Sequence, residues 1–275
     1  MATSSKPYLS IIIPAYNESE RLPKTLLDMD HHLSSVSYTY EIFVVNGGST
    51  DNTGEVVRNM MPTIKNLKLI DAPDSHGKGS AVRKGMLAAQ GEIRLFTDAD
   101  NATTIDHFDR MMPYFSGLSD PQNPLSPVRK KYDVVICSRA MKGSVMDPAE
   151  PWYRQIPGKM GNLWIQLFVL PGLWDTQCGF KAFTAEATEQ IFGLSRFAGW
   201  SFDIEILALA REVGFRIAEV PVHWRHDGNS KISLGAYLEV LFDVLKIRWM
   251  LWMDVYRLKH AGKQGLPGGG LSPGQ

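Results

Sequence analysis

The sequence predicts an α/β fold: a doubly wound, mainly parallel sheet flanked by helices. Short apolar runs alternate with longer segments in which apolar residues recur at helical spacing. This alternation is typical of a parallel sheet whose crossover helices cover both faces. Polar residues gather in the loops that follow the strands, and the ligand crevice of such a sheet lies at those strand ends. The sequence therefore predicts a binding site built from strand-end loops.

Composition excludes several classes of protein. Lys and Arg together number 29, as do Asp and Glu, in 275 residues, so no overall charge attracts nucleic acid. The two cysteines, Cys137 and Cys178, are too few for a disulfide scaffold or a zinc cluster. The N-terminus lacks an apolar signal core, and no run of about 18 uncharged apolar residues occurs, so we expect neither a signal peptide nor a transmembrane helix.

Strand and helix alternate regularly in the first part of the chain. Residues 8–14 form a near-continuous apolar run, as buried parallel strands do. The following helix, 19–36, carries Pro23 near its first turn, where proline is tolerated. Further strands are predicted at 40–45, 67–71 and 92–96, and further helices at 53–61, 80–89 and 105–115.

The second part of the chain is less regular. Strands are predicted at 132–138 and 216–222, helices at 152–170, 200–213 and 234–259, and loops at 117–129, 141–151 and 223–231. The last helix is rich in Leu, Val, Trp and Met but too charged to span a bilayer. It either packs on the sheet or lies in a membrane interface, with its tryptophans near the headgroups. Residues 261–275 are rich in Gly and Pro and are predicted to be disordered.

Asp98 and Asp100 follow the buried strand 92–96 directly. At this spacing the two carboxylates can face the same way, and hard oxygen ligands of this kind suit Mg²⁺ or Mn²⁺ shared with substrate phosphates. An isolated Asp-x-Asp is more often a solvated turn. Here the polar residues 16–18 and 46–51 end two other strands of the same sheet, which favours a binding site.

A glycine-rich turn at residues 77–80 opens the helix that follows. It is not a P-loop, because Ala72 stands where that motif needs a glycine. The backbone N–H groups at the helix start could hold an anion. The alternative is a plain glycine turn.

Six short motifs together resemble one family. They lie at residues 12–18, 45–51, 77–83, 97–100, 175–181 and 230–231. In them the chain resembles the inverting, GT-A-fold glycosyltransferases of family 2, most of all the dolichyl-phosphate β-glucosyltransferases and related polyprenyl-phosphate sugar transferases. The resemblance implies a Rossmann-like, mixed but mainly parallel sheet in a catalytic domain over residues 1–233. It implies an amphipathic, membrane-interfacial helix at 234–260, before the tail 261–275.

The resemblance also implies a nucleotide-sugar site. Pro14, Tyr16, Glu18, Gly47 and Lys78 would line it, and Asp98 and Asp100 would bind the metal and the diphosphate. The family usually has an aspartate that reads the nucleotide base where Gly47 stands. The implied donor is UDP-glucose, and the implied acceptor is a polyprenyl or dolichyl phosphate at a membrane surface. The protein would then be cytoplasmic and peripheral, on the cytosolic face of the endoplasmic reticulum in a eukaryote.

The chemistry of the acceptor decides which residues are needed for catalysis. A phosphate monoester has its second pKa near 6, so it attacks without a strong base and needs only cations to hold it. The candidate cations are Arg139, Arg154, Lys181 and Lys231. A sugar hydroxyl would instead need a carboxylate base, with Asp175 the first candidate and Asp203 the second.

Two alternative functions remain open from the sequence. One is transfer of mannose or another sugar to the same kind of lipid. The other is a nucleotide-binding pseudoenzyme, which the glycine at position 47 suggests and the retained Asp98 and Asp100 oppose.

Overall fold

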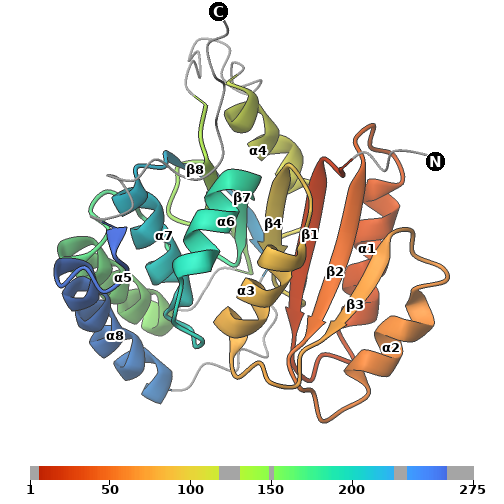
Figure 1. Ribbon diagram of the computed structural model, residues 1–275, viewed down its shortest axis with the longest axis horizontal. Coiled ribbons are helices and arrows are strands. Elements are labelled where there is room, and N and C mark those ends of the chain that lie inside the picture. Colours follow the sequence, from red (N-terminus) through yellow and green to blue (C-terminus); the bar gives the residue numbers. More distant parts are fainter. Residues whose placement is uncertain (1–5, 118–130, 149–151, 226–233, 259–275) are drawn as a thin grey trace, which may run out of the picture.

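The computed structural model describes residues 6–117, 131–148, 152–225 and 234–258 (Figure 1). At its centre is a seven-stranded sheet with the order β3-β2-β1-β4-β7-β5-β8. The strands are β1 Leu9–Ala15, β2 Tyr40–Asn46, β3 Leu67–Asp71, β4 Ile93–Thr97, β5 Val134–Ser138, β7 Phe180–Thr184 and β8 Ile217–Pro221. Only β7 runs antiparallel to its neighbours, β4 and β5, among the strands described. The sheet is therefore mixed and mainly parallel, as predicted.

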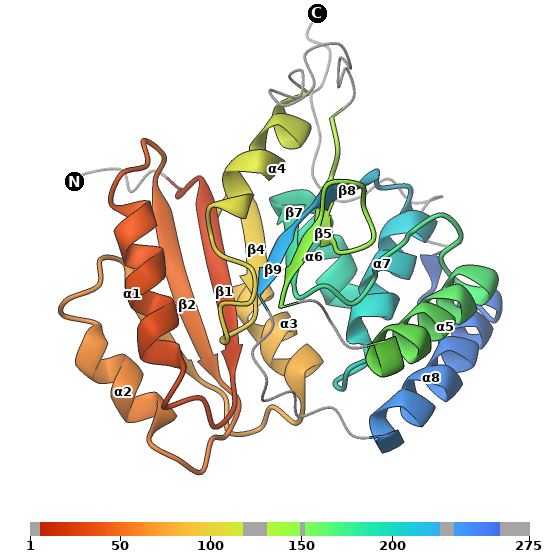
Figure 2. The same ribbon diagram turned by 180° about the vertical axis from the view of Figure 1, so that it is seen from behind.

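Helices cover both faces of the sheet. On one face lie α1 Leu22–Leu33, α2 Thr53–Met60 and α4 His107–Ser116, seen in front in Figure 2. On the other lie α3 Lys78–Ala88, α6 Ala185–Leu194 and α7 Phe202–Val213. Successive residues of β1 supply the two apolar cores in turn, Ile11 and Ile13 to one and Ile12 to the other, as the two-residue repeat of a strand requires.

Two further helices extend the second face. α5 Trp152–Phe168 and α8 Leu234–Trp252 lie side by side in both views and contact each other, with the indole N–H of Trp164 donating to the Leu241 carbonyl at 3.3 Å. Within the described ranges, no helix is both long enough and apolar enough to cross a bilayer.

Four elements were absent from the sequence prediction. They are β7, α6 and a small parallel pair, β6 Val145–Asp147 with β9 His223–Arg225. β7 was missed because its buried Lys181 makes the segment read as polar. The prediction also carried α8 too far: it ends at Trp252, and the positive φ angles of Asp254 and Arg257 stop any continuation. Most of the predicted loops at 117–129 and 223–231, and the tail 261–275, lie outside the described residues.

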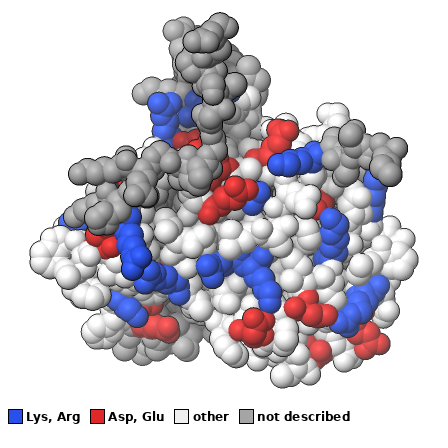
Figure 3. Space-filling view, viewed as in Figure 1, with Lys and Arg blue, Asp and Glu red and all other residues white. Residues whose placement is uncertain are grey.

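Basic and acidic side chains both occur on the face drawn in Figure 3, and a row of basic ones crosses its middle. Basic and acidic side chains are interspersed there among uncharged ones. This matches the balanced composition of 29 basic and 29 acidic residues.

Candidate active site

The loops after β1 and β2 are joined by hydrogen bonds at the carboxyl edge of the sheet. Asn17 holds a left-handed backbone, and its side-chain oxygen accepts from the amide N–H of Thr50 at 2.8 Å and of Asp51 at 3.3 Å. The amide of Glu18 donates to the Thr53 hydroxyl at 2.9 Å. These bonds make the two loops one wall of the crevice.

Three residues expected in the nucleotide site lie along this wall. Pro14 is in β1, and Tyr16 follows it with 57% of its surface exposed. The Glu18 carboxylate accepts two hydrogen bonds from the Arg21 guanidinium, at 2.7 and 2.6 Å. Tyr16 therefore presents its aromatic ring to solvent, and the carboxylate two residues later is held in place by Arg21.

Gly47 has an ordinary backbone conformation. Its N–H donates to the Ala15 carbonyl at 2.9 Å, and the positive φ in this loop belongs to its neighbour Gly48, at 73°. A Cβ added at Gly47 meets its nearest atoms, among them the Ala15 and Ser75 carbonyl oxygens, at 3.7 to 3.9 Å, which is ordinary contact. Position 47 thus has room for a side chain.

Asp98 lies at the end of β4 and pairs with Lys78, the first residue of α3. The Lys78 ammonium is 2.5 Å from the Asp98 carboxylate, and the Trp200 ring lies 5.6 Å from it. Burial lowers the pKa of Lys78, but the charges of Asp98 and Asp203 outweigh it and raise that pKa overall. Gly179 lies against the Asp98 carboxylate, where any Cβ would overlap it. The raised pKa keeps Lys78 charged against Asp98, at a point where only glycine fits at position 179.

Asp100 is half-buried, close enough to Asp98 to feel its charge. One of its oxygens accepts from the Ala102 N–H at 3.0 Å. Burial, and then the charge of Asp98, raise its pKa. A divalent cation between the two carboxylates would remove this repulsion, so the donor set fits a metal shared with a diphosphate. The described residues contain no group of three or more His, Cys, Asp or Glu side chains that could hold a metal without such sharing.

The helix start at α3 is less available to an anion than the sequence suggested. Gly79 and Ser80 direct their N–H groups at the Ala198 carbonyl, at 2.7 and 3.3 Å. Gly77 has φ of 99°, and a Cβ there would clash with the same carbonyl. The glycines bring α3 close to the 198–200 segment, and two of the N–H groups are used in doing so.

Asp175 and Arg139 form a closed ion pair on the other side of the crevice. The Asp175 carboxylate accepts from the Arg139 backbone N–H at 2.9 Å and from its guanidinium at 2.7 and 3.0 Å. Burial alone would raise the pKa of Asp175, but Arg139 holds it below its ordinary value. Glu219 accepts from the amides of Trp174 and Asp175, and the Arg139 guanidinium lies 5.4 Å from the Trp224 ring.

Lys181 and Asp203 form a second ion pair, inside the protein. Lys181 is fully buried in β7, with its ammonium 2.5 Å from the Asp203 carboxylate and 2.6 Å from the Cys178 carbonyl. Burial raises the pKa of Asp203. Lys181 therefore contacts Asp203 and the turn before β7, and its ammonium lies below the protein surface. Of the other predicted cations, Lys231 and the side chain of Arg154 lie outside the described residues.

The sequence analysis did not single out several residues of the site. Trp200, Glu219 and Trp224 each contact a predicted residue from a distant element. No local spacing points to such contacts, because they depend on how the elements pack. Asn17 stood in a predicted polar loop, but nothing in that loop indicated that its side chain bridges to the next one.

Comparison with known proteins identifies this arrangement. The family model for glycosyl transferase family 2 matches residues 10–192. The chain belongs to this family and has its GT-A fold, so it is a nucleotide-sugar glycosyltransferase.

Curated relatives show which members of the family the chain resembles. A dolichyl-phosphate beta-glucosyltransferase of Trichomonas vaginalis, ALG5A, is 38% identical over 245 residues, which is 87% of this chain and 72% of that protein. The dolichyl-phosphate beta-glucosyltransferase of Homo sapiens is 30% identical over 93% of this chain and 79% of its own length.

Among solved structures, glucosyl-3-phosphoglycerate synthase of Mycobacterium tuberculosis with Mn²⁺ and UDP has the same fold. The TM-score is 0.59 at 20% identity, over 88% of this chain and 80% of that one.

Proposed function

We propose that this glycosyltransferase transfers glucose from UDP-glucose to a dolichyl or other polyprenyl phosphate, with inversion at the anomeric carbon. The names of its relatives, at 30 to 38% identity, support this donor and acceptor. The main support for a phosphate acceptor is that Asp175, the first candidate for a catalytic base, is tied up in an ion pair with Arg139.

A sugar hydroxyl acceptor would need a base, and neither candidate carboxylate suits that role. The oxygens of Asp175 are engaged by Arg139, and its lowered pKa makes it a weak base. Asp203 is 3% exposed and paired with Lys181, out of reach of an acceptor. A phosphate monoester, already largely ionised at neutral pH, needs neither.

On the donor side, Asp98 and Asp100 would hold Mg²⁺ or Mn²⁺. When bound, the cation offsets the charge that develops on the departing diphosphate. Lys78, which lies against Asp98, contacts the same diphosphate. Pro14, Tyr16, Glu18 and Gly47 line the pocket for the nucleoside.

On the acceptor side, the phosphate is held by Arg139, Arg154 and Lys231. Lys181, buried as it is, contributes by fixing Asp203 and the turn at Cys178. These basic side chains hold the attacking oxygen of the acceptor phosphate in line with the anomeric carbon, on the face opposite the diphosphate. This positioning replaces the proton transfer that a hydroxyl acceptor would require.

The acceptor is a lipid, and the surface of α5 and α8 suits a membrane. Exposed apolar side chains project from both helices: Met160, Leu163 and Leu167 from α5, and Phe242, Trp249 and Trp252 from α8. Tryptophan is favoured at the level of lipid headgroups. We propose that the protein binds peripherally, on the cytosolic side of a membrane, and these exposed side chains support α5 and α8 as the surface against the headgroups.

A transfer assay tests the proposal. The protein is incubated with Mn²⁺ or Mg²⁺, a short polyprenyl phosphate and one labelled sugar nucleotide at a time, and the lipid product is analysed by mass spectrometry. We expect glucose transfer from UDP-glucose, a β linkage, and loss of transfer with EDTA. Transfer of mannose in preference to glucose would refute the donor assignment. No transfer from any donor, together with UDP binding, would identify a pseudoenzyme.

A further inference from the structure

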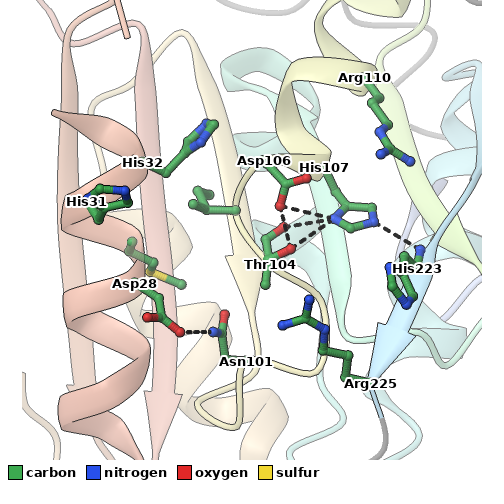
Figure 4. Close-up of a pocket in the computed structure, with 12 residues that line it drawn as sticks. Asp28, His31, His32, Asn101, Thr104, Asp106, His107, Arg110, His223 and Arg225 are labelled. Atoms are coloured by element: carbon green, nitrogen blue, oxygen red, sulfur yellow. Dashed lines mark hydrogen bonds and ion pairs between the residues drawn. The ribbon is translucent and has the colours of Figure 1, made fainter. Parts of the chain in front are cut away.

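A polar cavity of about 430 Å³ lies on the α1 side of the sheet, away from the crevice wall described above (Figure 4). It is bounded by α1, the loop after β4, the start of α4 and β9. His107, the first residue of α4, lines it and is only 3% exposed. No role considered so far uses this histidine.

Both ring nitrogens of His107 are engaged. Nε2 lies 2.9 Å from the backbone nitrogen of His223, and Nδ1 lies 3.0 Å from the Thr104 carbonyl oxygen. A backbone N–H can only donate, so Nε2 accepts, and the ring proton is on Nδ1, where it is donated to Thr104. The Asp106 carboxylate, 3.6 Å from Nδ1, favours the same tautomer. His107 therefore joins β9 to the loop after β4.

A second hydrogen bond joins β9 to the same loop at Ala102, and Ala102 is in turn bonded to Asp100. The Arg225 N–H donates to the Ala102 carbonyl at 2.8 Å, and the Ala102 N–H donates to the Asp100 carboxylate at 3.0 Å. Two hydrogen bonds, from the N–H groups of His223 and Arg225, thus tie β9 to residues 102–107, and a third joins this segment to Asp100. All the groups in these three bonds are backbone groups except the His107 ring and the Asp100 carboxylate.

We propose that His107 is a positioning residue for the divalent cation: by anchoring β9, it fixes the orientation of the Asp100 carboxylate. The inference rests on the proposed function, because it takes Asp98 and Asp100 as the metal ligands. Groups that orient a metal ligand change metal affinity or activity by roughly 10- to 100-fold when removed. His107 acts through two further hydrogen bonds, so we expect an effect of about tenfold.

Two amide substitutions separate the two bonds of His107. Glutamine carries its amide oxygen near the position of Nε2 and can still accept from the His223 N–H. Asparagine reaches only the position of Nδ1, so it keeps the Thr104 bond and loses the anchor on β9. The matched control is His31→Asn, since His31 lines the same cavity and its side chain makes no hydrogen bond within the part of the chain that the structure describes.

The test measures Mn²⁺ binding in the presence of UDP, by the electron paramagnetic resonance signal of free Mn²⁺, together with Tm and the KM for Mn²⁺ in transfer. We expect His107→Asn to bind Mn²⁺ about tenfold more weakly. We expect His107→Gln and His31→Asn to bind it within about threefold of the unchanged protein. The KM for Mn²⁺ should rise in His107→Asn more than kcat falls.

Equal Mn²⁺ affinity in the Asn and Gln variants, with a lower Tm in both, would overturn the proposal and leave His107 a purely structural residue. Should His107→Asn fail to fold, His107→Phe, which keeps a ring without nitrogens, replaces it with the same expectation. Failure of the proposed function has a different outcome: the unchanged protein itself would bind no Mn²⁺ with UDP and would transfer no sugar.

Discussion

Replacing Gly47 with aspartate tests how this protein reads the base of its donor. The resemblance noted in the sequence implies that an aspartate stands here in the family and that its carboxylate accepts a hydrogen bond from the base. The backbone permits the change, because Gly47 does not have positive φ and an added Cβ meets its nearest neighbours at 3.7 to 3.9 Å. The nearest of these are the carbonyl oxygens of Ala15 and Ser75, which favour rotamers that turn the carboxylate away from them.

The expected gain follows from these contacts. A hydrogen bond that involves a charged group contributes roughly 1.5–3 kcal/mol, which corresponds to about ten- to hundredfold in affinity. Water already bonded to the base offsets part of this gain. Loss of glycine also lowers the entropy of the unfolded chain, which is worth about 0.4–1 kcal/mol where no strain arises. Gly47→Asp should therefore bind UDP about tenfold more tightly, with Tm unchanged or slightly higher.

Calorimetry of UDP binding, the KM for UDP-glucose and Tm measure these effects. Gly47→Asn has nearly the same shape without the charge and should give a smaller gain. Gly48→Asp is the strained control: its φ is 73° and an added Cβ lies 3.3 Å from the Pro73 carbonyl, so it should lower both Tm and affinity. Weaker UDP binding in Gly47→Asp, with Tm unchanged, would refute the idea that glycine at position 47 has removed a contact to the base. It would mean that other residues recognise the base.

Three further outcomes follow from the site and the surface. Asp100→Asn should reduce metal-dependent transfer by about a hundredfold or more. The pKa of Asp100 is raised in the folded protein, so the ionised carboxylate destabilises the metal-free fold above that pKa. Without metal, Asp100→Asn should therefore have a higher Tm than the unchanged protein at pH 7. The two Tm values should be equal at a pH below the ordinary carboxyl range. Lys181→Met should lower the unfolding free energy by about 3–5 kcal/mol, because it leaves Asp203 buried and unpaired, and adding Asp203→Leu should restore much of it. An unfolding free energy in urea that does not fall in Lys181→Met would contradict the buried ion pair. Trp252→Gln should weaken flotation with liposomes that contain anionic lipid, whereas Leu27→Gln, on the exposed side of α1, should not; equal flotation would exclude α8 as the contact.

The strand-end loops were predictable because each depends on local sequence. A buried apolar run followed by polar residues marks the end of a parallel strand, and the edge of the sheet brings those ends together. Hence Tyr16, Asp98 and Asp100 were found where they lie, and β3 was predicted at its observed bounds, Leu67–Asp71. The mainly parallel sheet follows from the same alternation.

The partners of the charged residues were not predictable. Arg139 and Lys181 were read as cations for a phosphate, and the structure pairs them with Asp175 and Asp203, respectively. Each pair joins residues 22 to 36 positions apart, across elements whose packing no periodicity encodes. β7 was not predicted for a related reason. Its Lys181 forms an ion pair with Asp203, a residue distant in the sequence, and this pairing allows a charged residue in a core strand.

The strand order has a consequence for how the chain is made. β3, β2, β1 and β4 come from residues 9–97 and can pair as soon as that stretch has left the ribosome. The next strand in the sheet is β7, whose Thr184 pairs with Ile93, and β5 joins the sheet only through β7 and β8. Until residue 184 has been synthesised, β4 is an open edge with unpaired backbone groups, the kind of edge that recruits other chains. At about 5–20 residues per second this exposure lasts several seconds, so chaperone demand in synthesis should be concentrated between residues 97 and 184.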